Sequence, residues 1–209
     1  MKKNYISNSQ ESTRMFKSGV LEALSKVHFT VPLIIFVPVI IYFSWKAFAV
    51  ANVGIGGYLA WLVIGLLLWS VTEYLLHRFV FHHELKGKIG QRIHFVFHGV
   101  HHDYPSDRLR LVMPPSVSIP LALLFYWLFS LMLTPAHLYS FFPGFVLGYL
   151  FYDISHYAIH HFNFKGSVWK KIKQHHMLHH YSDPTKGFGV SSALWDKIFD
   201  SDFPNKKAR

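Results

Sequence analysis

Four long apolar stretches, separated by polar segments, dominate the pattern of this 209-residue chain. Each approaches the roughly 20 apolar residues that a helix needs to cross a bilayer. None shows the alternation of a membrane β-strand. The chain is therefore predicted to be all-α, with a four-helix transmembrane bundle. The predicted spans cover about residues 29–50, 55–76, 117–133 and 138–159.

The segments outside these stretches are polar. Residues 1–28 have mixed charge and lack the apolar region of a signal peptide. They are interpreted as a polar cytoplasmic leader that is solvated or interfacial. Residues 29–209 are predicted to form one integral membrane domain, in which the long polar segments make a histidine-rich helical cap on the cytoplasmic side.

The positive charges predict the orientation of the spans. Of the 21 Lys and Arg residues, only Lys46 lies near the two short connections between spans. The others precede the first span, lie between the second and third, or follow the fourth. The positive-inside rule then places both termini and the middle segment in the cytoplasm. A bacterial inner membrane is favoured, and the endoplasmic reticulum is the alternative.

The composition agrees with a membrane protein. Hydrophobic residues make up 51% of the chain and charged residues 15%, with a mean hydropathy of +0.23. A soluble domain usually carries about a quarter charged residues, so a buried helical bundle in a soluble protein is the less favoured alternative. A net charge of +10 suits nucleic acid or an anionic membrane surface. The hydrophobic content favours the lipid bilayer as partner and no nucleic acid.

The most unusual feature is the set of 16 histidines, most of which fall in four clusters on the predicted cytoplasmic side. The clusters lie within residues 77–83, 94–102, 156–161 and 175–180. Imidazole is the commonest metal ligand among side chains. The chain has no cysteine, which excludes thiolate zinc sites and cysteine-held iron–sulfur clusters. Repeated HxxHH and HxxxH spacing therefore indicates a metal site built from imidazoles.

Helical spacing selects eight of these histidines directly, and a further pair only with a local distortion of the helix. His98, His101 and His102 share one face at i, i+3 and i+4, and the fourth cluster repeats the pattern. The third cluster holds an i, i+4 pair. His77 and His82 are five residues apart, so they converge only at a helix end or a π-bulge. The ten are His77, His82, His98, His101, His102, His156, His160, His176, His179 and His180.

Ten imidazoles exceed what one metal can hold. A structural zinc site closes with four ligands. The surplus predicts a reactive two-metal centre with about five ligands for each metal and positions left open. The remaining histidines are assigned supporting or interfacial roles. The supporting ones are His83, His94, His161 and His175, and the interfacial ones are His28 and His137.

Two acids lie inside the predicted spans beside the histidine clusters. Glu73 is one turn before His77, and Asp153 is three residues before His156. Ionisable groups in a membrane are costly and need partners. A carboxylate often accepts the second ring N–H of a metal-bound histidine, and this is the expected role. The alternative is an acid paired with a nearby Arg or Tyr for packing alone.

The four clusters, in this order and at these intervals, resemble the fatty acid hydroxylase/sterol desaturase superfamily, and within it the fatty acid 2-hydroxylases. The resemblance covers roughly residues 20–200. HxxHH alone is shared by several branches, and the flanking segments make the resemblance more specific. These segments are Glu73-Tyr74 through His77-Arg78-Phe79, Arg110 to Pro115, Gly148-Tyr149 through Tyr152-Asp153, Gly187 to Val190, and Leu194-Trp195-Asp196.

The resemblance implies a membrane di-iron monooxygenase. The metal ligands of the family fall on the ten histidines selected above, and Tyr149, Tyr152 and Asp153 correspond to residues near the substrate and the metals. His94 is a ligand or a supporting group. Two iron ions would use dioxygen, two electrons and two protons to hydroxylate the carbon next to the carbonyl of a fatty acyl chain. Zinc could occupy the same ligands without performing that chemistry.

The resemblance also bears on partners. The substrate is expected to be a fatty acyl chain, either free or in a sphingolipid or other lipid. Many relatives carry a fused haem domain, and the 28 residues before the first span are too few for one. The electrons are therefore expected to come from a separate electron-transfer protein.

Several other readings stay open at this stage. An acyl desaturase or a sterol or carotenoid hydroxylase of the same superfamily would use the same metal centre. A non-redox metal-binding or transport protein should place its ligands along a path through the membrane. A zinc-dependent lipid hydrolase would use Asp153 or Glu73 as general base but would not need ten imidazoles.

Overall fold

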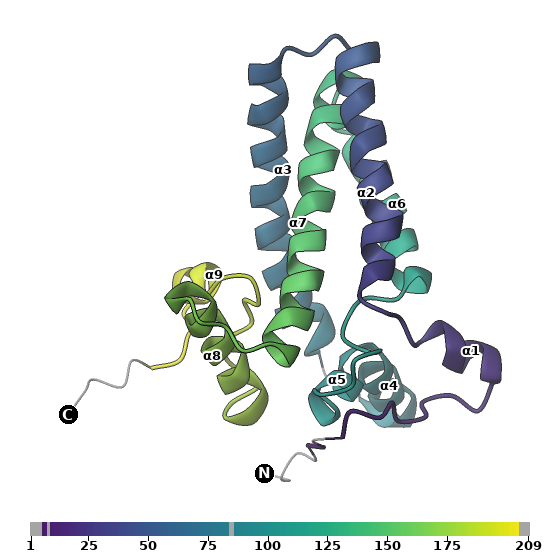
Figure 1. Cartoon of the computed structure of the whole chain (residues 1–209), viewed down its shortest axis with the longest axis vertical. Coiled ribbons are helices and arrows are strands. Elements are labelled where there is room, and N and C mark those ends of the chain that lie inside the picture. Colours follow the sequence, from purple (N-terminus) through teal and green to yellow (C-terminus); the bar gives the residue numbers. More distant parts are fainter. Residues whose placement is uncertain (1–5, 8, 84–85, 205–209) are drawn as a thin grey trace.

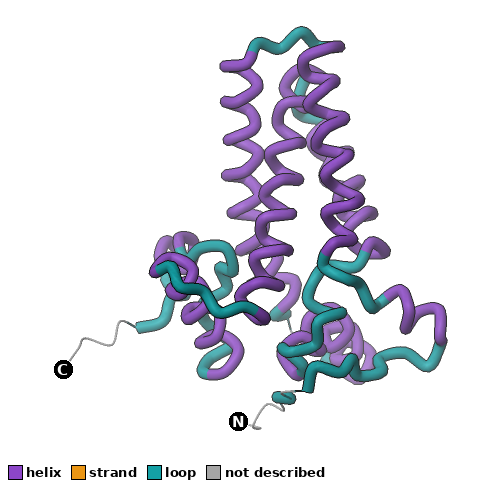
Figure 2. Tube along the Cα trace, viewed as in Figure 1, coloured by secondary structure: helices purple, strands orange, loops and turns teal. Residues whose placement is uncertain are grey.

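The computed structural model describes residues 6–7, 9–83 and 86–204, and every regular element among them is a helix. Four long helices stand side by side, and the shorter helices gather at one end (Figures 1 and 2). The predicted all-α class is confirmed. The long helices are α2 (Thr30–Trp45), α3 (Ile55–Leu75), α6 (Pro115–Ser130) and α7 (Pro135–His161). Two π-helical turns extend them, η1 (Lys46–Val50) after α2 and η2 (Leu76–Phe81) after α3.

These helices coincide with the four apolar stretches to within a few residues. Thr30–Val50 and Ile55–Phe81 are long and apolar enough to cross a membrane. Helix α6 is apolar but shorter, with 16 residues, and α7 has 27 residues of which many are buried inside the protein. The bundle of four helices is therefore present, whereas a membrane crossing by all four stays a prediction.

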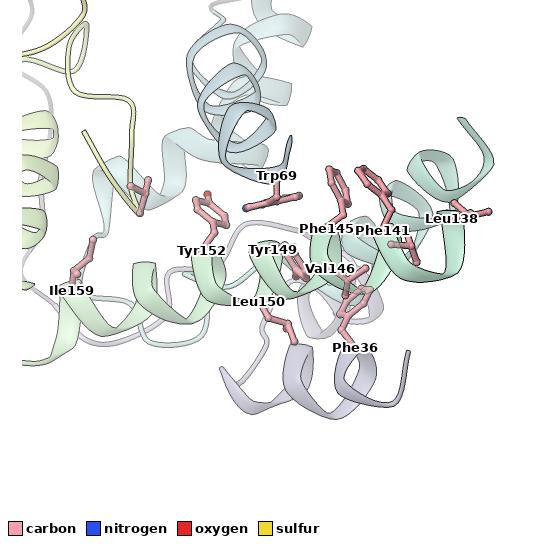
Figure 3. Close-up of a cluster of buried hydrophobic side chains, with 12 residues drawn as sticks. Phe36, Trp69, Leu138, Phe141, Phe145, Val146, Tyr149, Leu150, Tyr152 and Ile159 are labelled. Atoms are coloured by element: carbon pink, nitrogen blue, oxygen red, sulfur yellow. The ribbon is translucent and has the colours of Figure 1, made fainter. Parts of the chain in front are cut away.

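Helix α7 is the centre of the bundle and packs against α2, α3 and α6. Aromatic side chains fill the space between these helices (Figure 3). Trp69 of α3 meets Phe145 and Tyr149 of α7 edge to face, with ring centroids 5.2 and 5.4 Å apart. Phe36 of α2 contacts Tyr149 from the other side at 5.1 Å. These edge-on contacts hold α7 in place and so position the histidines at its end.

The short helices form a cap at one end of the bundle (Figure 1). The first and last described residues lie at this end as well. The cap consists of α4 (Gly87–His94), η3 (Phe95–Gly99), α5 (Val100–Asp103), α8 (Ser167–Tyr181) and α9 (Leu194–Ile198). A histidine-rich helical cap is thus present, and its place in the cytoplasm stays a prediction.

The described part of the predicted leader, residues 6–7 and 9–28, is mostly exposed and contacts the cap at a few buried positions, and its assignment as a polar cytoplasmic leader stays a prediction. Its short helix α1 (Gly19–Leu24) carries Glu22, which is buried and bonds to Arg110 at 2.6 Å. Burial alone would raise the pKa of Glu22. The backbone N–H groups of Met15 and Phe16, together with the nearby cations, outweigh burial and lower this pKa to about 2. The sequence did not reveal this role because the partner of Glu22 lies 88 residues away.

Helices α3 and α7 approach so closely that glycine is required on both. A Cβ at Gly144 would lie 2.0 Å from the carbonyl oxygen of Leu62, and one at Gly65 would lie 2.2 Å from that of Phe141. Both neighbours are backbone atoms, which cannot rotate away. Small residues that let backbones approach are typical of helix contacts in membranes.

Replacing Gly144 with alanine is expected to destabilise the bundle by about 1–3 kcal/mol, because the added methyl forces α3 and α7 apart. The matched control is Gly56→Ala on α3, where a Cβ meets nothing within 4 Å. That change should be neutral or slightly stabilising in a helix. Thermal unfolding of the purified protein in detergent measures both. An equal melting temperature for the two variants would contradict the close approach.

Candidate metal centre and family

A π-helical turn brings the first two histidines together. The chain continues from α3 into η2, and the N–H of His82 donates to the carbonyl oxygen of His77, five residues earlier, at 3.1 Å. A π-turn places residues at i and i+5 on one face. The predicted need for a π-bulge or a helix end is confirmed. A third π-turn, η3, contains His98 and leads into α5.

Five histidines form a first group, with one nitrogen of each within 4.8 Å of all the others. They come from three separate parts of the chain. The Nε2 atoms of His82 and His98 are 3.0 Å apart, and the Nε2 of His179 lies 2.9 Å from that of His82. This first group consists of His77, His82, His98, His102 and His179.

A second group of five lies beside the first. The Nε2 of His156 is 2.9 Å from that of His101 and 3.1 Å from that of His176. The Nε2 of His180 lies 3.0 Å from that of His176. This second group consists of His101, His156, His160, His176 and His180. The structure therefore brings together all ten histidines selected from the sequence, as two sets of five.

Hydrogen bonding cannot account for these contacts. A neutral imidazole has one N–H donor and one lone pair. Yet the Nε2 of His82 lies within 3.2 Å of the Nε2 atoms of four other histidines. Nitrogens bound about 2.0–2.1 Å from one metal ion, at right angles to each other, lie roughly 2.9 Å apart. The spacing in both groups fits a metal ion at each centre.

The environment keeps these imidazoles neutral, which is the form that binds metal. Burial, followed by the neighbouring imidazoles, holds the pKa of His98 and of His101 well below the usual 6.5. The same causes lower the pKa of His176. Because the lone pairs are free at neutral pH, both groups are ready to coordinate a cation.

Residues 186–191, here called the clasp, hold the far side of the first group. The Nδ1–H of His77 donates to the carbonyl oxygen of Phe188, and the Nδ1–H of His179 donates to that of Lys186 at 2.6 Å. Each bond assigns the proton to Nδ1 and leaves the Nε2 lone pair facing the group. Gly187 adopts φ +70°, which bends the clasp so that both carbonyls point inward.

The acids do not bind the second nitrogens of the histidines as expected. Glu73 instead accepts the backbone N–H groups of Val190 and Ser191 at 3.0 and 2.7 Å. Asp153 accepts the N–H of Met113 at 3.1 Å and the hydroxyl of Tyr149 at 3.1 Å. Carbonyl oxygens of the clasp take the role that was expected of carboxylates. Sequence reasoning missed this because any residue supplies a carbonyl, and only the paired glycines Gly187 and Gly189 hinted at a bend.

The other histidines lie outside the two groups. His83 is exposed, and His94 packs against Gly99 without joining either group. The ring of His161 lies over Tyr157, and the Nε2 of His175 bonds to Asp202 at 3.1 Å. The structure places none of these residues where it could ligate with the ten. His28 bonds to Thr30, and His137 stacks on Trp61.

A cavity of about 240 Å³ opens beside both groups. Its wall includes His98 of the first group and His101 and His156 of the second. Tyr152 and Asp153 also line it, and their substrate-facing role stays a prediction. Tyr149 lies deeper, beside Trp69, and lines a smaller hollow of about 20 Å³. The other lining side chains are mostly apolar, and they include Leu21, Leu24, Phe81, Phe97, Val112 and Val117.

The family model described as fatty acid hydroxylase matches residues 62–201, a range that contains all ten histidines and the clasp. This chain belongs to the fatty acid hydroxylase family. The predicted family is confirmed, and with it the predicted enzyme class, because a fatty acid hydroxylase is an oxidoreductase.

Individual relatives agree over most of the chain. This hydroxylase is 36% identical to dihydroceramide fatty acyl 2-hydroxylase FAH1 of Arabidopsis thaliana, over 96% of this chain and 84% of that protein. It is 38% identical to fatty acid 2-hydroxylase of Homo sapiens, over 92% of this chain and 57% of that protein. A solved structure of full-length scs7p, with only the hydroxylase domain visible, matches with a TM-score of 0.84 and 34% identity, over 89% of this chain and 70% of that chain.

The lowered histidine pKa values predict how stability depends on pH. In the unfolded, metal-free hydroxylase these histidines accept protons near pH 6.5, whereas burial prevents His98, His101 and His176 from doing so in the fold. The melting temperature of the metal-free protein should therefore be flat above about pH 7.5 and fall as the pH drops through 6.5 towards 5.

Thermal unfolding after chelation, measured across this range, checks that expectation. Glu22 contributes little to the change, because its carboxyl stays ionised in the fold and gains a proton in the unfolded chain only near its ordinary pKa of 4.5, below the pH range of the series. Protein reloaded with zinc is the control, and it should keep its melting temperature to lower pH because the bound metal occupies the lone pairs. A metal-free melting temperature that is the same at pH 7.5 and 5.5 would contradict the buried neutral imidazoles.

Proposed function

We propose that this hydroxylase places a hydroxyl group on the carbon next to the carbonyl of a fatty acyl chain, with two iron ions as its cofactor. One observation carries the proposal. A mostly apolar cavity is lined by histidines of both groups, so a bound acyl chain would lie directly beside two metals. The family and the names of the relatives point the same way.

The ten histidines would hold the metals as two sets of five. Five imidazoles leave room in the coordination sphere for a further ligand, unlike a closed structural zinc site. Imidazole suits iron, and a redox metal is required because an unactivated C–H bond is broken. When bound, the iron pair supplies the activation of dioxygen for that oxidation. The share of the protein is to position the substrate and to exclude water.

The location of the cavity favours the carbon next to the carbonyl. The histidines lie in η2, near the end of α7 and in the helices of the cap, which is the depth of the lipid headgroups if the apolar helices span the bilayer. A lipid would leave its carbonyl at this depth, and the first chain carbons would then be nearest the metals. Oxidation in the middle of a chain would instead need a tunnel leading from the headgroups past the metals.

The charges around the cavity favour a neutral lipid over a free fatty acid. Arg110 is the cation that lines the cavity, and it is already paired with Glu22 at 2.6 Å and with Asp107 at 3.3 Å. Asp153 also lines the cavity. A carboxylate would therefore enter without an unpaired side-chain cation to bind, whereas the amide of an N-acyl sphingolipid carries no charge. The relatives named for dihydroceramide and ceramide agree with this choice.

The enzyme would work in a membrane with electrons from a separate protein. We expect four spans with both termini in the cytoplasm, in a bacterial inner membrane. Lys170 and Lys171 lie in the first half of α8, before its histidines, and both are exposed. They would suit contact with anionic headgroups or with an acidic electron donor.

Expression in a host that lacks 2-hydroxy acids, with a supplied electron donor, tests the reaction. Mass spectrometry of the total lipids should detect new 2-hydroxy acyl chains with the intact enzyme and none with His101→Ala. His161→Ala, which removes a histidine outside both groups, should keep the product. New double bonds, or hydroxyl groups elsewhere, would indicate a desaturase or another hydroxylase of the superfamily. Bound metal without any oxidation would indicate a non-redox metal-binding protein.

Glu22→Gln is expected to shift the enzyme towards free fatty acids. Removing this carboxylate leaves Arg110 with less negative charge around it, so a substrate carboxylate is accepted more readily. The ratio of 2-hydroxylated product from free acid to that from ceramide, in a competition assay, should rise. Glu11→Gln, an exposed acid of the same segment, is the control and should leave the ratio unchanged. An unchanged ratio in Glu22→Gln would contradict the electrostatic basis of the preference.

A further inference from the structure

The two histidine groups differ in how their outer nitrogens are held. In the first group, Nδ1 of His77 and Nδ1 of His179 bond to carbonyl oxygens of the clasp. In the second group, the Nδ1 atoms of His101, His176 and His180 are buried and meet no hydrogen-bond partner among the described residues. Two sets of ligands with the same chemistry are thus oriented to different degrees.

The clasp is itself held by a fully buried carboxylate, that of Asp196. Its Oδ1 accepts the N–H of Phe188 and its Oδ2 accepts the N–H of Gly189, both at 2.8 Å. Its Oδ1 also accepts the hydroxyl of Ser201 at 2.8 Å. Because both oxygens bind the backbone of the clasp, Asp196 sets the direction in which the carbonyl of Phe188 points at His77.

Glu73 holds the other end of the clasp from α3. Its Oε1 accepts the N–H groups of both Val190 and Ser191, and its Oε2 accepts the hydroxyl of Ser191 at 2.7 Å. Helix α3 runs directly into the turn that carries His77. The clasp is therefore fixed to the same helix as the histidine that it orients.

We propose that Asp196 and Glu73 are positioning residues that make the first group the tighter of the two metal sites. The proposal rests on the ligand role proposed for both groups. An imidazole whose outer N–H is already hydrogen-bonded keeps its tautomer and ring orientation. Less side-chain conformational entropy is therefore lost when the metal binds. The second group must order its rings when metal arrives. Metal therefore fills the first site before the second.

Single-site variants separate the two sites in the full-length protein. His180→Ala removes a ligand of the second group and leaves the first intact, and His179→Ala does the reverse. Metal-free protein in detergent is titrated with Co²⁺, and binding is followed by visible absorption. The intact protein should bind two ions in two steps. The affinity of His180→Ala should match the tighter step and that of His179→Ala the weaker one.

Asp196→Asn is then added to each single-site variant. An amide offers one acceptor oxygen, so it cannot bind both Phe188 and Gly189 as the carboxylate does. Co²⁺ affinity should fall by about 10–100-fold in the His180→Ala background. It should not change in the His179→Ala background, where only the second site remains. Asp200→Asn is the matched control and should change neither site, because Asp200 is an exposed acid of the same segment whose positive φ of 53° an asparagine also tolerates.

Glu73→Gln gives a graded second test. Its amide oxygen can still accept both N–H groups that Oε1 accepts, so the loss of Co²⁺ affinity at the first site should be smaller than with Asp196→Asn. Circular dichroism and melting temperature establish that each variant is folded before titration.

Several outcomes would overturn the proposal. One is an equal Co²⁺ affinity of the two single-site variants, and another is a failure of either of them to bind Co²⁺. A change in affinity with Asp196→Asn that is equal at both sites, or absent at both, would also overturn it. An effect that is the same at both sites would mean that Asp196 serves only the stability of the fold. None of these measurements uses hydroxylation, so they stand apart from the lipid analysis that tests the proposed reaction.

Discussion

The structure depends on one constraint, which is that ten imidazole lone pairs must converge while uncharged. Protonated rings at separations near 3 Å would repel one another strongly in a buried site. Burial keeps the rings neutral, as the lowered pKa values of His98 and His176 indicate. Burial in turn requires that other parts of the chain cover the ends of α3 and α7, and the helices of the cap do so. The cost of gathering neutral lone pairs is offset when a cation sits among them.

The bundle supplies the rigid frame for this arrangement. Gly65 and Gly144 let α3 and α7 touch along their backbones, so the histidines at the ends of the two helices have little freedom to separate. The edge-on aromatic contacts of Trp69 with α7 act in the same way. Ligands carried on packed helices are held more accurately than ligands on loops. The clasp is the exception, since it is a loop that two buried carboxylates make rigid.

The same end of the molecule also shapes what can reach the metals. The N-terminal segment adds apolar side chains to the cavity wall through Leu21 and Leu24, and it neutralises Arg110 through Glu22. A segment far from the histidines in sequence thus contributes both shape and charge to the cavity beside them. In this fold the two histidine groups and the cavity share walls, so positions such as Asp153 bond to the backbone of the fold and line the cavity at once.

The sequence by itself determined the four helices and eight of the ten clustered histidines, because apolar length and the spacing of residues on a helix are local properties. The remaining pair, His77 and His82, converges through the π-turn η2. Local spacing cannot say how the faces are shared. His98 and His102 belong to the first group, whereas His101 belongs to the second. On α8, His179 belongs to the first group, and His176 and His180 belong to the second. That division, the clasp under His77, and the pairing of Glu22 with Arg110 join segments that are distant in sequence. Only the packing of the helices decided them, because a carbonyl or a carboxylate finds such a partner only after the chain has folded.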